Sequence, residues 1–308
     1  MIEMIKTKVT LGLLALPFVF AGCSGDENLP GGEVNDGRVA LQVSSGIQTR
    51  AFDDQWEDDD QIGIFMLNNG QNTVADGYDN VPYRVESAGT GGKAFAPSSE
   101  VIYFPTNGDK RDFIAYYPYS ADKVANGVYA IDLTNQDPQR NIDFMLAGKV
   151  TDKSRDDANV SFQFTHKLAK IIMDIQPGDG VTDDDLKNIT VSLTGQPTEG
   201  TFDVLNGQNV AVTSTDKKAV TLLADAGGTH AEGIVFPSEN YDGMSFTFTT
   251  QAIGSYEWTL SSSEKAIKFE SGKKYLYTIT IHRTFIDVTS TIKDWEPGNE
   301  GGESDSAE

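Results

Sequence analysis

The chain has 308 residues and a formal net charge of −22, from 46 acidic and 24 basic side chains. Such an acidic surface repels phosphate backbones, so the composition argues against a nucleic-acid partner. Hydrophobic residues make up 38% of the chain and aromatic residues 10%, enough for a packed core and too many for a disordered chain. The single cysteine, Cys23, excludes an internal disulfide and a multi-cysteine zinc site.

The first 22 residues have the layout of a secretory signal peptide. Two lysines, Lys6 and Lys8, precede an apolar run that is shorter than the roughly 20 residues needed to span a bilayer. The sequence "FAGC" that ends at Cys23 resembles the lipobox of bacterial lipoproteins, although Phe20 replaces the usual leucine. The resemblance implies that the leader, residues 1–22, is cut off and that Cys23 carries a lipid in the outer membrane. An ordinary signal peptide followed by an incidental cysteine is the alternative.

Residues 23–37 are polar, glycine-rich and acidic, which is typical of a flexible tether. The acidic pair Asp26 and Glu27 resembles the signal that carries some lipoproteins to the cell surface. Without the leader, the chain has a net charge of about −23. We therefore expect a soluble exterior that is held at the cell surface only by the lipid on Cys23.

Short strands with turn residues between them fill the chain from residue 38 onward. In "RVALQVSSGI" the residues Val39, Leu41 and Val43 share one face, and "VSFQFTH" alternates in the same way. Asn-Gly and Pro-Gly pairs separate these runs, and no long stretch has a helical period. The pattern predicts an all-β sandwich architecture with one helical turn at "TDDDLKN", capped by Thr182.

The clearest break in the strand pattern falls at "QPGDGVTDDD". It divides the chain into an N-terminal β-sandwich domain at residues 38–178 and a C-terminal one at residues 179–298. Residues 299–308 are acidic and almost without apolar side chains, so we expect a frayed tail.

Signals for an enzyme are poor. The three histidines, His166, His230 and His282, lie far apart, and neither a zinc-protease motif nor a serine-nucleophile elbow occurs. The acidic runs at residues 58–60 and 183–185 lack the alternating spacing of a calcium loop. We predict no catalytic residue, no metal and no cofactor, and we expect His166 to be buried or at a rim and bonded to backbone.

Several segments together resemble the fimbrillin family. They are, in chain order, "TRAFDDQWEDDDQIGIFM", "DFMLA" followed by "VSFQFTHKLAKI", "FESGKKYLYTITI" and "IKDWEPG". The resemblance implies two transthyretin-like antiparallel β-sandwich domains in tandem and a role as a structural subunit of a surface pilus, the fimbrium. The implied partners are other pilus subunits, either copies of this chain or related fimbrillins.

In polymerising fimbrillins, a trypsin-like protease cuts after an arginine and removes the first strand, and a strand of the next subunit fills the groove. The resemblance places this cut between Arg50 and Ala51. The removed segment, within residues 38–50, would carry the apolar side chains of Val39, Leu41, Val43 and Ile47. The donor candidate is segment 284–294, in which Ile286, Val288 and Ile292 form a similar alternating face. Equally, segment 284–294 fits the last strand of its own domain.

A second functional hypothesis is a monomeric surface lipoprotein that binds a glycan or a host ligand. Exposed aromatic platforms would favour it, and the candidates are Trp56, Trp258 and Trp295. The sequence does not distinguish a shaft, tip or anchor subunit.

Overall fold

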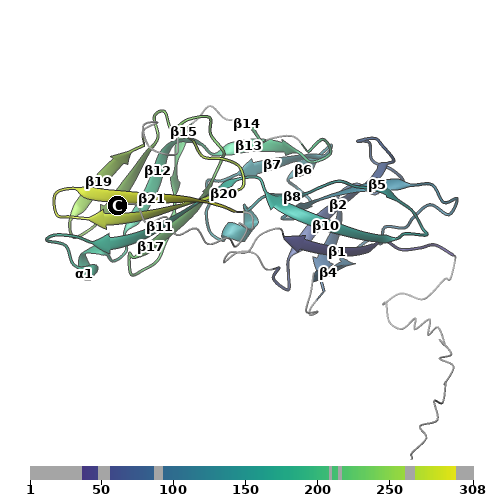
Figure 1. Cartoon of the computed structure of the whole chain (residues 1–308), viewed down its shortest axis with the longest axis horizontal. Coiled ribbons are helices and arrows are strands. Elements are labelled where there is room, and N and C mark those ends of the chain that lie inside the picture. The colour runs from purple at the N-terminus through teal and green to yellow at the C-terminus, as the bar shows by residue number, and fades with distance from the viewer. Residues whose placement is uncertain are drawn as a thin grey trace, which may run out of the picture. The chain divides into compact units, whose positions relative to one another are not determined.

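The computed structural model describes residues 37–47, 56–86, 93–207, 210–213, 217–260 and 268–295, which belong to one compact unit beginning at Gly37 (Figure 1). Strands dominate these residues, so the all-β prediction is confirmed. No helix in this part of the chain is long and apolar enough to cross a membrane. The predicted signal peptide, Cys23, the acidic tail and the cut between Arg50 and Ala51 lie outside the described residues.

The N-terminal part of the unit is built on an eight-stranded sheet. In spatial order its strands are β2 (Gln61–Asn68), β3 (Val81–Val85), β4 (Lys93–Pro97), β1 (Gln42–Ile47), β10 (Asn159–His166), β8 (Met145–Ala147), β5 (Arg111–Tyr117) and β9 (Val150–Lys153). Strand β2 also pairs with β5, from Gly63 opposite Tyr116 to Asn68 opposite Arg111. This pairing closes the sheet into a ring around a core that is lined by side chains of β1, β2, β5 and β10.

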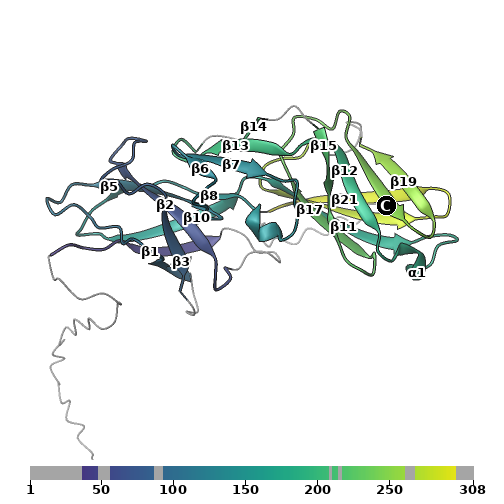
Figure 2. The same ribbon diagram turned by 180° about the vertical axis from the view of Figure 1, so that it is seen from behind.

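Strands β2 and β5 are buried on both faces, which explains their continuous apolar sequences. Inside the ring, Ile64 of β2 and Phe113 of β5 join the core already described. Their neighbours Phe65 and Ile114 point to the other face and belong to a second core. Across that second core lies a four-stranded sheet, in which β7 and β13 lie side by side (Figures 1 and 2). Its order is β14 (Ala211–Val212), β13 (Glu199–Asp203), β7 (Val128–Asp132) and β6 (Val124–Ala125).

The C-terminal part is a sandwich of two sheets around a third core. The five-stranded sheet has the order β16 (Leu223–Ala224), β17 (His230–Val235), β11 (Ala169–Pro177), β20 (Lys273–Ile281) and β21 (Ile286–Asp294). The four-stranded sheet has the order β15 (Lys217–Thr221), β12 (Thr190–Pro197), β18 (Ser245–Thr250) and β19 (Gly254–Thr259). Strand β21 is therefore an edge strand, paired along its whole length with β20.

The predicted domain boundary after residue 178 does not coincide with a change of sheet. Strand β11 precedes the boundary, yet it pairs with β20 and β17 of the C-terminal sandwich. Strand β13 follows the boundary and pairs with β7 of the N-terminal part. Sheet pairing joins segments that are far apart in sequence, which a break in the strand pattern does not detect.

The predicted helical turn is α1 (Asp183–Leu186), and a 3-10 turn, η1 (Gln139–Asn141), accompanies it. Thr182 donates from its backbone N–H to Asp185 Oδ2 at 2.9 Å and from its hydroxyl to the same oxygen at 2.8 Å. The backbone hydrogen bond lowers the pKa of Asp185 from its usual value. The acidic run at residues 183–185 thus forms the first turn of a capped helix.

Candidate functional site

Strand β1 occupies the middle of the eight-stranded sheet. It runs parallel to β10, with Gln42 opposite Asn159 and Ile47 opposite Phe164. On its other side it runs antiparallel to β4, with Val43 opposite Phe95. Since both edges of β1 are paired, the removal of this strand would separate β4 from β10 and leave two rows of unpaired backbone groups.

The side chains of β1 alternate as the sequence predicts. Leu41 and Val43 are buried in the core inside the ring, with 5% and 6% of their surfaces exposed. Val39 is half-buried, and the side chain of Ile47 lies outside the described residues. Ser45 follows Val43 on the same face, and its buried hydroxyl has no hydrogen-bond partner among the described residues. Burial of the Leu41 and Val43 side chains stabilises β1 by about 1.5–3 kcal/mol each.

The chain that enters β1 is also attached to the sheet. Leu41 N–H donates to the carbonyl of Ile102 at 2.9 Å, and Gln42 N–H donates to that of Ala158 at 3.0 Å. The guanidinium of Arg38 lies 4.2 Å from the centre of the Tyr103 ring. This segment therefore lies in a slot of the sheet, between neighbours on both sides.

Downstream of residues 48–55, Trp56 fixes the chain again. Its side chain is 6% exposed and packs edge-on against the rings of Phe95, Tyr117 and Phe164, with centroids 5.2, 5.3 and 5.2 Å away. Arg50 thus belongs to a segment between two attached points, β1 and Trp56. Trp56 would stay with the body of the protein after a cut at that segment.

Hydrogen bonds to Asp60 fix the turn that follows Trp56. The Tyr117 hydroxyl donates to Asp60 Oδ1 at 2.8 Å, and the backbone N–H of Glu57 donates to Asp60 Oδ2 at 2.8 Å. Burial raises the pKa of Asp60 above its usual value. Asp58 and Asp59 are exposed. The acidic run at residues 58–60 therefore forms a turn, and the hydrogen bonds to Asp60 hold it in place.

The donor candidate, segment 284–294, contains strand β21 of the C-terminal sandwich. Its inward side chains are shallow: Ile286 and Val288 are half-buried against the core, and Ile292 is 40% exposed. Phe285, in the turn before β21, is 50% exposed. In this structure the segment forms the last strand of its own sheet, and β1 fills the slot of the same subunit.

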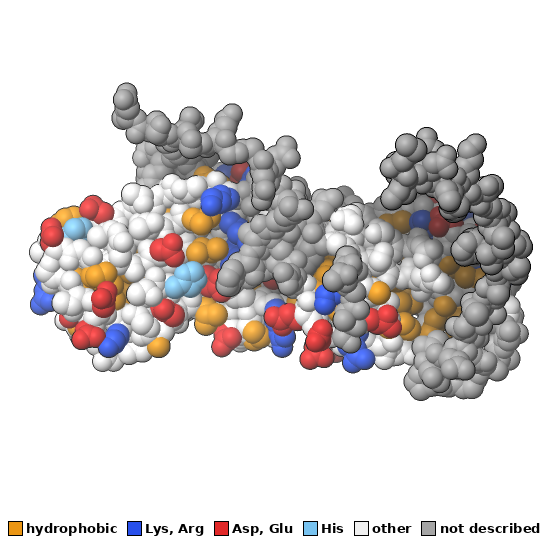
Figure 3. All heavy atoms as spheres, turned by 60° about the horizontal axis from the view of Figure 1, so that its bottom comes forward, with side chains coloured by type: hydrophobic (Ala, Val, Ile, Leu, Met, Phe, Trp, Pro, Cys, Tyr) orange, Lys and Arg blue, Asp and Glu red, His pale blue; other side chains and the backbone are white. Residues whose placement is uncertain are grey.

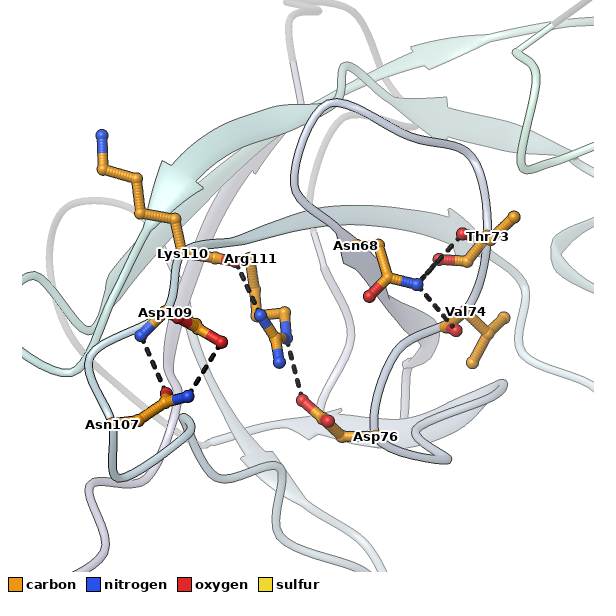
Figure 4. Close-up of polar contacts among 8 residues, drawn as sticks. All are labelled: Asn68, Thr73, Val74, Asp76, Asn107, Asp109, Lys110 and Arg111. Carbon is orange, nitrogen blue, oxygen red and sulfur yellow. Dashed lines mark hydrogen bonds and ion pairs between the residues drawn. The ribbon is translucent and has the colours of Figure 1, made fainter.

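The loops at one end of β2 and β5 hold a polar cluster, drawn in Figure 4. The Asn68 amide donates to Thr73 Oγ1 at 3.0 Å, and Arg111 Nε lies 2.8 Å from Asp76 Oδ2. Asn107 and Asp109 close their own turn with a 2.9 Å and a 3.0 Å bond. Each of these groups has a partner inside the cluster, so the cluster orders the loops.

No metal centre was found: no group of three or more His, Cys, Asp or Glu side chains within the described ranges could hold an ion. His166 is buried as predicted, but the prediction of a backbone partner is wrong. Its Nδ1 lies 2.7 Å from Oδ1 of the Asp143 carboxylate. On the face in Figure 3, acidic and basic side chains are scattered, with hydrophobic ones between them.

The tryptophans do not form exposed platforms. Trp56 and Trp295 are buried, and Trp258 is half-buried in a stack with Phe246 at 5.4 Å. The eleven tyrosines are all buried or half-buried as well. A hollow of about 590 Å³ beside β8 and β10 is lined by aliphatic, amide, hydroxyl and lysine side chains, with no aromatic ring among them. The hollow therefore offers a sugar ring no aromatic surface on which to stack.

Comparisons with known proteins give a consistent result. Residues 49–295 match the model of the family described as fimbrillin-like. The chain is 41% identical to "Putative fimbrium subunit Fim1C" of Bacteroides uniformis, over 98% of this chain and 100% of that protein. The solved structure of a "putative cell adhesion protein" from Bacteroides uniformis is 40% identical, with a TM-score of 0.76 over 85% of this chain and 100% of that one.

A second solved structure, of a "putative cell adhesion protein" from Bacteroides ovatus, shares the fold at 23% identity. Its TM-score is 0.65, over 85% of this chain and 99% of that one. The matched residues include β2 to β21, so the resemblance seen in the sequence motifs extends through every described strand except β1, which precedes the match. The chain therefore belongs to the fimbrillin-like family, which is a structural and adhesive family and not a family of enzymes.

Proposed function

We propose that this protein is a structural subunit of a cell-surface pilus that polymerises by donor-strand exchange. One observation carries the proposal: β1 lies in a slot between two strands, and β21 repeats its side-chain pattern. Residues 41–47 read "LQVSSGI" and residues 286–292 read "IDVTSTI". The names of the relatives, a fimbrium subunit and a cell adhesion protein, support a role at the cell surface.

The two segments agree position by position. Ile286, Val288 and Ser290 would take the inward places of Leu41, Val43 and Ser45, and Ile292 aligns with Ile47 in the sequence. The serine matches as well: Ser45 is the polar residue of the inward face of β1, and Ser290 has the same place in β21. Because strand side chains alternate between faces, a shift by one residue would turn the apolar side chains of β21 outward, and a shift by two would no longer place Ser290 at Ser45. We infer that β21 of one copy replaces β1 of the next, in the direction and register of β1.

The largest increase in size falls at Gly46, where one neighbouring side chain has to move. Gly46 would be replaced by Thr291, and a Cβ built at Gly46 lies 3.2 Å from Oε1 of Gln163. Gln163 is exposed, and the contact is made by the far end of its side chain. A small rotation of Gln163 therefore admits the threonine, whose branched side chain also favours a strand.

The cut after Arg50 would provide the vacancy. It separates β1 from Trp56, which keeps its aromatic contacts in the core. Strand β1 would then be bound only by two ladders and by a few side chains, and a second strand could displace it. In this proposal Cys23 anchors the uncut chain in the outer membrane through its lipid and leaves with the removed segment.

The remaining expectations from the sequence extend the proposal. We propose that residues 1–22 are removed on export and that residues 23–37 tether the subunit. We also propose that the two halves of the unit are transthyretin-like domains in tandem. The structure gives little support to the alternative of a glycan-binding monomer, because the tryptophans and tyrosines are buried or half-buried.

Cleavage at Arg50 is expected to convert monomers into polymers. After treatment with an arginine-specific protease, the wild-type protein should give a ladder of high-mass bands on a gel and a new N-terminus at Ala51. Arg50→Ala should remain monomeric, because β1 then stays covalently joined to its own subunit.

The matched control is Arg38→Ala. Arg38 precedes β1, so a cut there leaves Leu41, Val43 and both ladders in place. This variant should polymerise as the wild type does. Ladders from Arg50→Ala as strong as those of the control would rule out the proposed cut.

A further inference from the structure

Strand β21 is held mainly by its backbone hydrogen bonds to β20. None of the described side chains of β21 is buried, and the last buried residue before it is Ile281. The nine residue pairs from Lys273 opposite Asp294 to Ile281 opposite Ile286 supply the backbone bonds. An edge strand of this kind, with few buried contacts, opens more readily than the interior of a sheet.

Directly after β21, the chain enters a core. Trp295 is 1% exposed and belongs to the core between the eight-stranded sheet and the sheet of β7 and β13, not to the core under β21. Its backbone N–H donates to the carbonyl of Gly272 at 2.7 Å. Trp295 thus anchors in a core a strand whose own described side chains are not buried.

The Trp295 ring has a specific receiver in His166. The two rings stack with centroids 3.8 Å apart and planes 11° from parallel. The Asp143 carboxylate, 2.7 Å from His166 Nδ1, fixes the orientation of the imidazole, whose side chain is fully buried. The Lys274 ammonium lies 5.7 Å from the centre of the Trp295 ring and adds a cation–π contact.

The position of this receiver connects it with the exchange site. His166 is the last residue of β10, the strand against which β1 is paired up to Phe164. Strand β10 therefore has two roles in this proposal. Its last residue, His166, contacts Trp295, and its preceding residues form one edge of the slot that holds β1.

We propose that Trp295 is a latch, docked on His166, that keeps β21 in its own subunit until assembly. This inference rests on the proposed function in one respect, that β21 is the strand to be donated. Before β21 can leave, Trp295 must withdraw from its core and lose the stack with His166. The latch keeps uncleaved and unpartnered subunits from offering a loose apolar strand, which is an aggregation hazard.

Amide hydrogen exchange of the uncleaved full chain tests the latch without any polymerisation. Trp295→Ala should speed exchange of the amides in β20 and β21 that bond to one another by about tenfold or more, since an aromatic anchor is lost. The ladder between β11 and β17 should exchange as in the wild type. Ile292→Ala is the matched control, because it removes an exposed side chain of the same strand, and it should leave these rates unchanged.

Trp295→Phe covers the case in which Trp295→Ala unfolds the protein as a whole. Phenylalanine keeps an aromatic ring in the core but loses part of the stack, so β21 should exchange at an intermediate rate. Equal exchange of β21 in Trp295→Phe and Ile292→Ala overturns the latch. So does a rise in Trp295→Ala that is spread evenly over β11, β17 and β21, because Trp295 is then an ordinary core residue.

A polymerisation assay separates this inference from the proposed function. If the latch holds, cleaved Trp295→Ala should polymerise several-fold faster than the cleaved wild type. If the wild type does not polymerise at all, the exchange rates still decide whether Trp295 retains β21. If the wild type polymerises and the variants leave β21 unchanged, only the latch is refuted.

Discussion

Val288→Asp is expected to abolish polymerisation while leaving a folded monomer. In the exchanged state, residue 288 would occupy the place of Val43, which is 6% exposed inside the ring. An unpaired carboxylate at such a site costs on the order of several kcal/mol. Since every 1.4 kcal/mol changes an equilibrium about tenfold, strand insertion should become weaker by a factor of about a thousand.

The monomer is expected to tolerate the same substitution. In β21 itself Val288 is only half-buried, at the edge of the sheet, and water can reach the new carboxylate. The control is Thr289→Asp, which places the same charge on the exposed neighbouring residue. After protease treatment, Thr289→Asp should give ladders and Val288→Asp should stay monomeric. Comparable ladders from both variants would contradict the proposed insertion.

Trp56→Ala is expected to lower the free energy of unfolding by about 3–5 kcal/mol, which is usual for a buried tryptophan. The substitution leaves a cavity among three aromatic rings that meet Trp56 edge-on at 5.2 to 5.3 Å. Each of these contacts adds about 0.5–1.5 kcal/mol to the effect of burial alone. Urea denaturation followed by circular dichroism measures the loss.

Trp258→Ala gives the comparison. Trp258 is half-buried on β19, an edge strand, so its removal should cost clearly less stability than that of Trp56. Because Trp56 lies beyond the cut, Trp56→Ala should also lower the stability of the protein that begins at Ala51. An equal loss in Trp56→Ala and Trp258→Ala would show that Trp56 is not the anchor described above.

Much of the secondary structure follows from the sequence because local patterning determines it. The alternation of Val160, Phe162 and Phe164 predicts a strand with one buried face, and β10 has that pattern. Thr182 and the acidic run after it predict the turn of α1. The alternation of Leu41 and Val43 likewise predicts the inward face of β1.

The neighbours of each strand could not be predicted in this way. Alternation says which face is buried, but not that β1 lies between β4 and β10, nor that it runs parallel to β10. The pairing of β7 with β13 joins residues about seventy positions apart, and no local signal marks it. A boundary drawn from a break in the pattern therefore separates strands that the fold brings together.

Trp295 and His166 illustrate the same limit at the level of side chains. In the sequence, Trp295 is one aromatic residue next to an acidic tail, and His166 is one histidine at the end of a strand. Their stack depends on β21 ending beside β10, which is a property of the tertiary structure. The repeat of "LQVSSGI" as "IDVTSTI", by contrast, is visible in the sequence once β1 is known to be a central strand.

The most direct test of the central claim is a disulfide that forms only after exchange. Ser44 of β1 lies opposite Ala94 of β4, and Thr289 of the next subunit would take the place of Ser44. Directly opposite residues of an antiparallel pair have Cα atoms about 4.5–5.5 Å apart, which lies within the range that a disulfide spans. In a single subunit Ala94 and Thr289 belong to different sheets. The measurement uses Ala94→Cys with Thr289→Cys in a Cys23→Ser background, on a non-reducing gel after cleavage.

We expect covalent ladders after cleavage, which a reducing agent converts to monomers, and no ladders before cleavage. Ala94→Cys with Val288→Cys is the control, because a shift of one residue turns the thiol to the other face, and it should form polymers without disulfides. Polymers of the Ala94→Cys, Thr289→Cys protein that contain no intersubunit disulfide would contradict the claim that β21 replaces β1 in this register.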